Sequence, residues 1–504
     1  MSILYFKGLI KKQEQHILLI MVMAAVFVTR LLMLFQTSYP NGLDGFFYAL
    51  EARSFMERCH LENPNAGPVY YLAGLLAILI GDPIASVKIM SAALSSLYVS
   101  VIFLFLRKWV DKAFALTGAL FAAISPSLVL MSVNYLNNML GVVSFIAFCA
   151  IGTQMFRHVQ KLRPGNLFLL MVTALLSIIS HPTTAVFLCA VVFLFLFQII
   201  IRRKSGKVIV ISLAFMMVIL FFASLFLGIA DLERFKGVFS LKPALALLSG
   251  FFIDKLSLAV ALEMTIYMLS AYVFVFYYCR ANRGFTVYLL MIPLFYFPFW
   301  NLDQLDMGYR LLLAATPFGI IFLILFLSMI SGNTMASEKK DGTRRNSSAL
   351  NKNLRFAYLL LPFIWVSTFS YNSDRDPPYA YYRVLVEKID LPEDSLLIAH
   401  QGLNHVYTYY NHFKDSLNYV PDFEIPVEKL WRICYGLSPR LIITQFPEAA
   451  EKGLVWELGD EYTLIREDYW QQFLDFSEPE LRESYNNWYN PFTARPKFIR
   501  AEKK

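Results

Sequence analysis

The sequence predicts an all-α polytopic membrane domain followed by a small extracytoplasmic α/β domain. Hydrophobic residues make up 57% of the 504 residues and charged residues only 16%, whereas a soluble protein carries about a quarter charged residues. Apolar runs near the roughly 20-residue length that crosses a bilayer recur through residue 371. The charge then changes sign: residues 1–371 hold 30 Lys and Arg against 15 Asp and Glu, and residues 372–504 hold 15 against 22.

We expect about eleven spans in residues 1–371, which form the membrane domain. The expected spans are 17–35, 87–106, 113–131, 139–156, 167–181, 183–201, 208–228, 258–279, 285–300, 311–330 and 356–371. An excess of Lys and Arg is typical of the short cytoplasmic loops of membrane proteins. The basic composition therefore predicts contact with membrane lipid and requires no nucleic acid as a partner.

The distribution of Lys and Arg predicts the orientation of the spans. If the amino terminus is cytoplasmic, that terminus and the cytoplasmic loops hold 21 Lys and Arg, and the outer loops before residue 372 hold seven. Residues 331–355 then form a basic cytoplasmic linker, and residues 372–504 lie outside the plasma (cell inner) membrane. The apolar segment 68–81 is short for a span, and counting it would invert every later loop. We expect it to be a re-entrant or juxtamembrane helix.

The carboxy-terminal segment alternates strand and helix patterns. "SLLIAH" (395–400) and "RLIITQF" (440–446) are typical of strands, and "NHVYTYYN" (404–411) between them is typical of a helix. This alternation predicts a small α/β domain over residues 372–504.

The first outer loop, residues 36–86, carries the main candidate for catalysis. On a helix that starts near residue 43, Asp44, Tyr48 and Glu51 share one face, and Arg53 and Glu57 can pair on the opposite face. An interfacial helix explains the aromatic residues and the Arg53–Glu57 pair. It does not require an acid directly after the turn "YPNG". The pattern favours a functional role for Asp44, while Glu51 fits function and structure equally well.

Three regions of the sequence resemble the GT-C superfamily of glycosyltransferases, which includes protein mannosyltransferases and lipid A aminoarabinose transferases. "DGFFYALEARSFMERCH" (44–60) and "NAGPVYYLAGLLAILIG" (65–81) are similar to its first outer loop. "MGYRLLLAATPFG" (307–319) is similar to the Arg-containing start of a late span, and "LPEDSLLIAHQGLNHVYTYY" (391–410) to the soluble tails of bacterial members.

The resemblance implies inverting sugar transfer, in the outer leaflet, from a polyprenyl-phosphate donor to a glycan, lipid or protein acceptor. Asp44 matches the acid of the first loop in this superfamily, which acts as a general base or places the acceptor. A general base must lie within hydrogen-bond reach of the acceptor hydroxyl. Glu51 is the second candidate catalytic acid.

The sequence departs from the superfamily at the loop 132–138. Many members carry a second acid there, whereas this chain has "VNYLNN". Asn134, Asn137 and Asn138 can bind a sugar, but amide oxygens are weak neutral ligands for a metal. We therefore expect transfer without a cofactor; a divalent metal held by Asp44 and Glu51 is the alternative.

Four further residues are candidates for the substrate site. Arg310 lies at the outer mouth of a span, where its guanidinium can grip a lipid phosphate or simply reach the interface beside Asp303 or Asp306. Lys255 can add a phosphate contact. His181, in "SHPTT", and Glu263 are ionisable groups in apolar surroundings, which favours substrate binding, although a turn or a buried partner also explains them.

Two other classes of function remain open. A transporter or flippase of a lipid-linked or small substrate would show paired broken helices in matching halves, and the sequence contains no internal repeat. A non-enzymatic envelope-assembly protein would use the soluble tail as its interaction module. Retained function after Asp44→Asn would favour this last class.

Overall fold

The computed structural model describes residues 3–42, 44–62, 67–157, 164–201 and 307–330, together with shorter stretches between 263 and 503. These residues form two compact units. The first unit comprises 1–35, 63–72 and 89–371, and the second comprises 36–62, 73–88 and 372–504. The candidate acid Asp44 belongs to the second unit, and Arg310 and His181 belong to the first.

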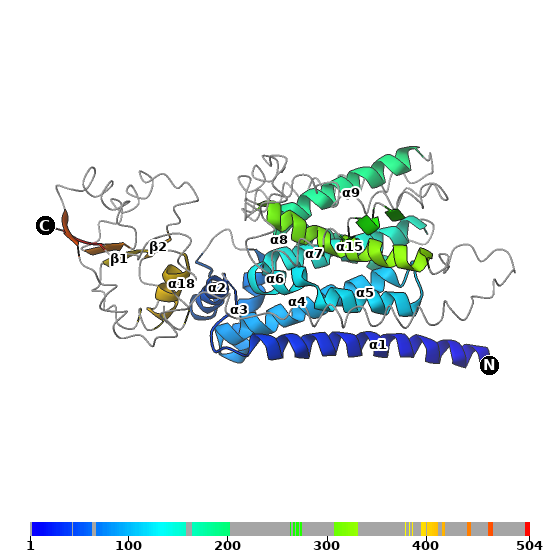
Figure 1. Ribbon diagram of the computed structural model, residues 1–504, viewed down its shortest axis with the longest axis horizontal. Coiled ribbons are helices and arrows are strands. Elements are labelled where there is room, and N and C mark those ends of the chain that lie inside the picture. Colours follow the sequence, from blue (N-terminus) through cyan, green and yellow to red (C-terminus); the bar gives the residue numbers. More distant parts are fainter. Residues whose placement is uncertain are drawn as a thin grey trace. The chain divides into compact units, whose positions relative to one another are not determined.

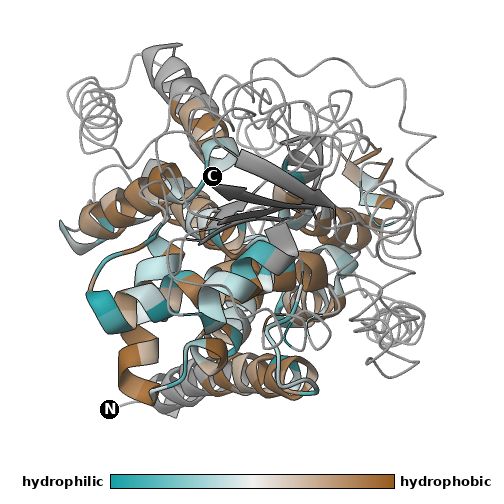
Figure 2. Cartoon of the chain, turned by 90° about the vertical axis from the view of Figure 1, so that its left-hand side faces the viewer, coloured by the Kyte–Doolittle hydropathy of each residue, from teal (hydrophilic) through white to brown (hydrophobic). Residues whose placement is uncertain are grey.

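The first unit is built from helices (Figure 1). Their bounds are α1 Ile3–Leu34, α4 Pro83–Leu106, α5 Lys112–Ile124, α6 Pro126–Asn134, α7 Leu136–Arg157, α8 Pro164–Ser180, α9 Pro182–Ile201 and α15 Met307–Ile330. The first residues of α4, through Lys88, belong to the second unit. Glu263 and the described residues between it and Phe274 are also helical. Hydrophobic residues prevail along these helices (Figure 2), as burial in lipid and in helix contacts requires.

Within the described residues, two helices are long and apolar enough to cross a membrane: α4, and Leu313–Ile330 within α15. The pair α5 and α6 is a third if its bent halves form one span. The helices expected at 87–106, 139–156, 167–181, 183–201 and 311–330 are present as α4, α7, α8, α9 and α15. The spans expected at 208–228, 285–300 and 356–371 lie outside the described residues.

The span expected at 113–131 is bent, because the helix breaks at Ser125, and whether its two halves form one span stays a prediction. The axes of α5 and α6 differ by 50°. Pro126 occupies the first turn of α6, and the Ser125 side chain accepts a hydrogen bond from Leu128 N at 3.3 Å. A proline lacks the N–H that a continuous helix needs, and a serine caps the new helix. The dipeptide "SP" thus ends α5 and begins α6, whose axis points in a new direction.

The helices of the first unit pack closely around α7, which contacts α8, α9 and α15. The ring of Phe145 lies 6.1 Å from that of Phe187 and 5.3 Å from that of Phe318. Gly141 allows a close approach, because a Cβ there would lie 2.6 Å from Oγ1 of Thr184. Arg30 is buried in the same unit, and its Nη2 donates to the Ala123 carbonyl at 2.9 Å.

The second unit contains α2 (Gly45–Arg58), most of α3 (Pro68–Ile80) and the carboxy-terminal elements. The strands are β1 Ser395–Ala399, β2 Ser416–Asn418, β3 Leu441–Thr444, β4 Tyr462–Arg466 and β5 Ile499–Lys503, and the helix α18 is Gln401–Tyr410. The strands form one sheet in the order β2-β1-β3-β5-β4. The pairs β1–β2 and β1–β3 are parallel, and β5 runs antiparallel to β3 and β4.

The strands expected at 395–400 and 440–446, and the helix between them, are therefore present as β1, β3 and α18. The class of the whole domain stays a prediction. Helix α3 is 13 residues long, as expected for the short apolar segment 68–81, and whether it crosses the membrane also stays a prediction.

Helix α18 packs against α2 within the second unit (Figure 1). The Arg53 guanidinium donates to the Tyr409 carbonyl and lies 5.0 Å from the centre of its ring. Phe47 stacks on His405, with the ring centres 5.0 Å apart. A guanidinium over a tyrosine ring and stacked rings each add attraction beyond simple burial. The tail is thus held against the helix that follows Asp44.

Candidate active site

Asp44 lies at the start of α2, in a tight turn. The Gly45 N–H donates to the Gly42 carbonyl at 3.3 Å, and Asp44 has φ −94° and ψ 10°. These angles suit the third residue of a type I turn. The side chain makes no hydrogen bond that caps α2, although an aspartate at this position often does. The residue is half-buried, and its carboxylate does not cap α2.

The helix expected near residue 43 is confirmed, and Asp44 precedes it. Tyr48, one turn further on, is buried, and its N–H donates to the Asp44 carbonyl at 3.0 Å. The expected pair on the opposite side is present, with Arg53 Nε 2.7 Å from Glu57 Oε1. A pair at this spacing on one helix adds only a few tenths of a kcal/mol, about 0.2–0.5 kcal/mol.

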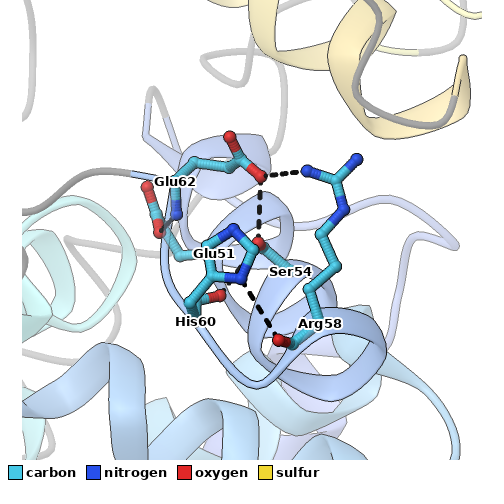
Figure 3. A network of polar contacts seen from close by, with 5 residues as sticks. All are labelled: Glu51, Ser54, Arg58, His60 and Glu62. Carbon is cyan, nitrogen blue, oxygen red and sulfur yellow. Dashed lines mark hydrogen bonds and ion pairs between the residues drawn. The ribbon is translucent and has the colours of Figure 1, made fainter.

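Glu51 is completely buried, and its carboxylate has a structural partner. Oε2 accepts a hydrogen bond from the Glu62 N–H at 2.9 Å. Glu62 in turn binds Ser54 Oγ at 3.0 Å and Arg58 Nη1 at 2.8 Å, and His60 Nδ1 lies 3.1 Å from the Arg58 carbonyl (Figure 3). This network holds the chain that returns after α2. A catalytic role for Glu51 stays a prediction.

The described residues contain no group of three or more His, Cys, Asp or Glu side chains that could hold a metal ion. One carboxylate oxygen of Glu51 already accepts a hydrogen bond from the Glu62 backbone N–H. The arrangement gives no metal site to which a step could be assigned, and the expectation of transfer without a cofactor stays a prediction.

His181 occupies the break between α8 and α9 in the first unit. It is buried, and its Nδ1 accepts a hydrogen bond from the Thr183 N–H at 3.2 Å and lies 2.9 Å from Thr183 Oγ1. Pro182 fills the first position of α9, where no N–H is needed. Thr184 Oγ1 donates to the His181 carbonyl at 2.8 Å. The imidazole thus caps α9, and its other nitrogen points away from the cap.

Arg310 lies in the first turn of α15 and reaches this imidazole. Its Nη1 is 3.3 Å from His181 Nε2, and its Cζ is 5.1 Å from the centre of the Tyr135 ring. A tyrosine face beside a guanidinium orients the planar group and leaves its edge available for hydrogen bonds. Two residues that the sequence suggested separately, His181 and Arg310, are therefore brought together.

The three asparagines flank the break between α6 and α7. Asn134 ends α6, and Asn137 and Asn138 lie in the first turn of α7, so only Tyr135 separates the two helices. The longer loop expected at 132–138 is therefore wrong. Because Ser132 and Val133 continue the hydrogen bonding of α6, the chain turns within one residue.

The asparagines differ in their contacts. Asn137 Oδ1 accepts from the Val69 N–H at 3.3 Å. Asn138 is buried, and its Nδ2 has no hydrogen-bond partner within the described part of the chain. The same holds for Ser180 Oγ, directly before His181. Buried polar atoms of this kind are costly unless a ligand or water satisfies them.

Glu263 is completely buried in the first unit and anchors α6. Its Oε2 accepts from Ser127 N at 3.1 Å and from Ser127 Oγ at 2.7 Å, and its Oε1 accepts from Tyr267 OH at 2.8 Å. A carboxylate at a helix amino terminus is favoured by the helix dipole. These contacts give Glu263 a structural role, and substrate binding stays a prediction. Lys255 lies outside the described residues.

Sequence reasoning missed Tyr135 and Lys88. Tyr135 shares the segment "VNYLNN" with the asparagines, but nothing local predicts its contact with Arg310. Lys88 is buried in the second unit, and its Nζ donates to the Thr37 carbonyl at 2.6 Å. A lysine in the apolar stretch "PIASVKIM" is itself a signal, because charged groups are rare in such surroundings. It anchors the beginning of the loop that carries Asp44.

Comparisons with known proteins add independent findings. The family model described as dolichyl-phosphate-mannose-protein mannosyltransferase matches residues 66–227. No curated protein matches the chain. The crystal structure of ArnT from Cupriavidus metallidurans bound to undecaprenyl phosphate has a TM-score of 0.55 and 12% identity, and the alignment covers 96% of this chain and 97% of ArnT. The apo structure of the same ArnT gives 0.54 and 11%, with 97% and 98% covered.

The similarity in fold extends over nearly the full length of both chains. The fold implied by the resemblance of the first outer loop, the start of α15 and the tail is thereby confirmed. The chain is a multi-pass membrane protein, and its fold is similar to that of the two ArnT structures.

Proposed function

We propose that the protein is an inverting membrane glycosyltransferase that moves a sugar from a polyprenyl-phosphate carrier to a glycan, lipid or protein acceptor outside the cytoplasm. The family-model match and the GT-C fold support this class of reaction. The ArnT structure was determined with undecaprenyl phosphate bound, which supports a carrier of the same chemistry. The observation that carries the proposal is the arrangement of His181 and Arg310.

His181 and Arg310 bring two nitrogen atoms together. The Nδ1 atom of His181 faces Thr183, and its Nε2 atom lies 3.3 Å from Nη1 of Arg310. When the ring proton is on Nε2, both nitrogen atoms are donors. An anionic phosphate oxygen then accepts from both through charge-assisted hydrogen bonds.

The proposed donor site therefore binds the lipid phosphate through Arg310 and His181. Tyr135 keeps the guanidinium in place through its ring. The buried Nδ2 of Asn138 and Oγ of Ser180 lie in the same unit and suit hydroxyl groups of a bound sugar. Asn134 is a further candidate for the sugar, whereas Asn137 already holds the Val69 N–H with its oxygen.

Asp44 is the proposed general base. Its carboxylate accepts the proton of the acceptor hydroxyl while that oxygen forms a bond to the anomeric carbon of the donor sugar. The bond between the anomeric carbon and the phosphate oxygen breaks, and the lipid phosphate leaves with the electron pair. Hydrogen-bond donors bound to the phosphate stabilise the charge that develops on it as it leaves. The step therefore balances in atoms and charge, and it requires no nucleotide.

The test uses the full-length protein in detergent with undecaprenyl-phosphate sugars that carry a hexose, an N-acetylhexosamine or an aminopentose. An envelope extract supplies acceptors, and the release of undecaprenyl phosphate together with transfer of labelled sugar is measured. We expect turnover with one donor class and a loss of about a hundredfold or more in Asp44→Asn and Arg310→Ala.

Asp111→Asn and Arg58→Ala are the matched controls. Asp111 caps α5 through Phe114 N, and asparagine caps a helix equally well. Arg58 forms an exposed pair with Glu62. Both controls should retain full activity. Absence of turnover with every donor, or full activity of Asp44→Asn, would contradict the proposed reaction and favour transport or envelope assembly.

A further inference from the structure

We infer that Tyr379, in the carboxy-terminal part of the chain, positions Asp44 for catalysis through the carbonyl of Gly42. The Tyr379 hydroxyl donates a hydrogen bond to that oxygen at 2.5 Å, across 337 residues of sequence. Both residues belong to the second unit. The inference rests on the proposed function, in which Asp44 is the base.

The Gly42 carbonyl closes the turn that carries Asp44. It also accepts the Gly45 N–H at 3.3 Å, so both lone pairs of this oxygen are used. Gly42 has φ +83°, a left-handed conformation that glycine adopts without strain. Gly45 sits close to Pro40, because a Cβ at residue 45 would lie 3.1 Å from the Pro40 carbonyl carbon. The turn is therefore specified on both sides of Asp44.

Tyr379 is itself held by packing. Its ring meets that of Phe46 edge to face, with the centres 4.7 Å apart at 71°. Phe46 and Tyr379 are 1% and 3% exposed. Tyr379 thus contacts the chain on both sides of Asp44: the Gly42 carbonyl before it through the hydroxyl, and Phe46 after it through the ring.

The rest of the tail reinforces this contact further along α2. Tyr409 and Tyr410 of α18 place their rings 5.4 and 5.9 Å from Phe46. Arg53, two turns later, binds the Tyr409 carbonyl. The tail therefore holds both the turn and the helix that follows it. Because Asp44 lies between these two segments, its position is held as well. A base displaced by about 1 Å can lose a hundredfold in rate.

The decisive variant is Tyr379→Phe, which removes the hydroxyl and keeps the ring on Phe46. We expect kcat to fall about tenfold or more, with the KM for the undecaprenyl-phosphate sugar and the Tm unchanged. The matched control is Tyr39→Phe, since the Tyr39 ring also lies near Phe46, at 6.4 Å. The Tyr39 hydroxyl forms no hydrogen bond among the described residues, and this control should keep the wild-type kcat.

A second pair of variants tests the turn without touching the tail. Gly42→Ala and Gly81→Ala introduce the same backbone strain, because the two glycines have φ +83° and +79°. Open space surrounds the site of a Cβ at Gly81. We expect the two variants to have similar Tm values. The kcat of Gly42→Ala should fall about tenfold, whereas Gly81→Ala should keep the wild-type kcat.

The outcomes separate the two proposals. If the wild-type protein transfers no sugar, the proposed function fails and the role of Tyr379 fails with it. If the wild type is active and both Tyr379→Phe and Gly42→Ala keep its kcat, only the positioning role is overturned. A loss of Tm with unchanged kcat in the folded protein likewise overturns it, because it identifies Tyr379 as a structural contact alone.

Discussion

Nη1 of Arg310 lies 3.3 Å from Nε2 of His181, although 129 residues separate them in the chain. The Thr183 N–H fixes the opposite side of the imidazole, and the Tyr135 ring fixes the guanidinium. The two side chains are thus oriented before any substrate binds. Preorganised donors of this kind lose little freedom on binding, which favours affinity for an oxyanion.

Arg310→Lys should impair donor binding even though the positive charge is retained. Lysine cannot present the planar pair of N–H groups, and its contact with Tyr135 differs. Loss of a hydrogen bond to a charged group costs about 1.5–3 kcal/mol, which corresponds to a rise of about tenfold to a hundredfold in donor KM. Steady-state kinetics measure this change. Arg58→Lys, in an exposed ion pair, should leave KM unaltered, and a normal KM in Arg310→Lys would argue against bidentate phosphate binding.

Replacing His181 with asparagine and with glutamine should separate its contribution to stability from its contribution to donor binding. Asparagine places its oxygen near Nδ1 and keeps the cap on Thr183, but it has no group near Nε2. Glutamine reaches the Nε2 position and loses the cap. We therefore expect His181→Asn to keep the Tm and raise donor KM about tenfold.

The second amide, His181→Gln, should keep the KM and lose about 1 kcal/mol of stability. Thermal unfolding and kinetics on the same preparations test both variants. Equal effects of the two variants on KM would show that the imidazole does not reach the donor through Nε2.

Much of the fold followed from local patterns in the sequence. The apolar runs located α4, α7, α8, α9 and α15, because length and hydropathy alone select helices in lipid. The turn "YPNG" located the start of α2, and the spacing of four residues predicted the Arg53–Glu57 pair. The break at Ser125 was also readable from "SP", although the continuous apolar run concealed it.

The partners of the site residues could not be predicted in the same way. Glu51 shares a helix face with Tyr48, yet its carboxylate binds the Glu62 backbone beyond the end of α2. Arg310 with His181, and Tyr379 with Gly42, are joined only by tertiary packing. Spacing along one helix defines a face, but the side chain that this face meets depends on elements far away in the sequence.

Glu263→Gln should destabilise the first unit and leave donor binding unchanged. The carboxylate accepts from Ser127 N, Ser127 Oγ and Tyr267 OH, and an amide must turn its NH2 toward at least one of these donors. An unsatisfied buried group costs about 1–3 kcal/mol. Thermal unfolding in detergent should show the loss, whereas Glu62→Gln, at an exposed pair, should change the Tm little. Normal stability together with a raised KM would instead support substrate binding by Glu263.

Tyr409 should make the stability of the protein sensitive to alkaline pH. Burial raises the pKa of the Tyr409 hydroxyl, and the nearby Arg53 guanidinium offsets only part of this rise. In the unfolded chain the hydroxyl titrates near its usual value of about 10. The folded state therefore holds this proton more tightly, so the stabilisation is complete below pH ~10 and is lost as the pH rises further. The Tm in detergent should fall more steeply between about pH 9 and 11 in the wild type than in Tyr409→Phe. Identical slopes for the wild type and Tyr409→Phe would contradict the prediction.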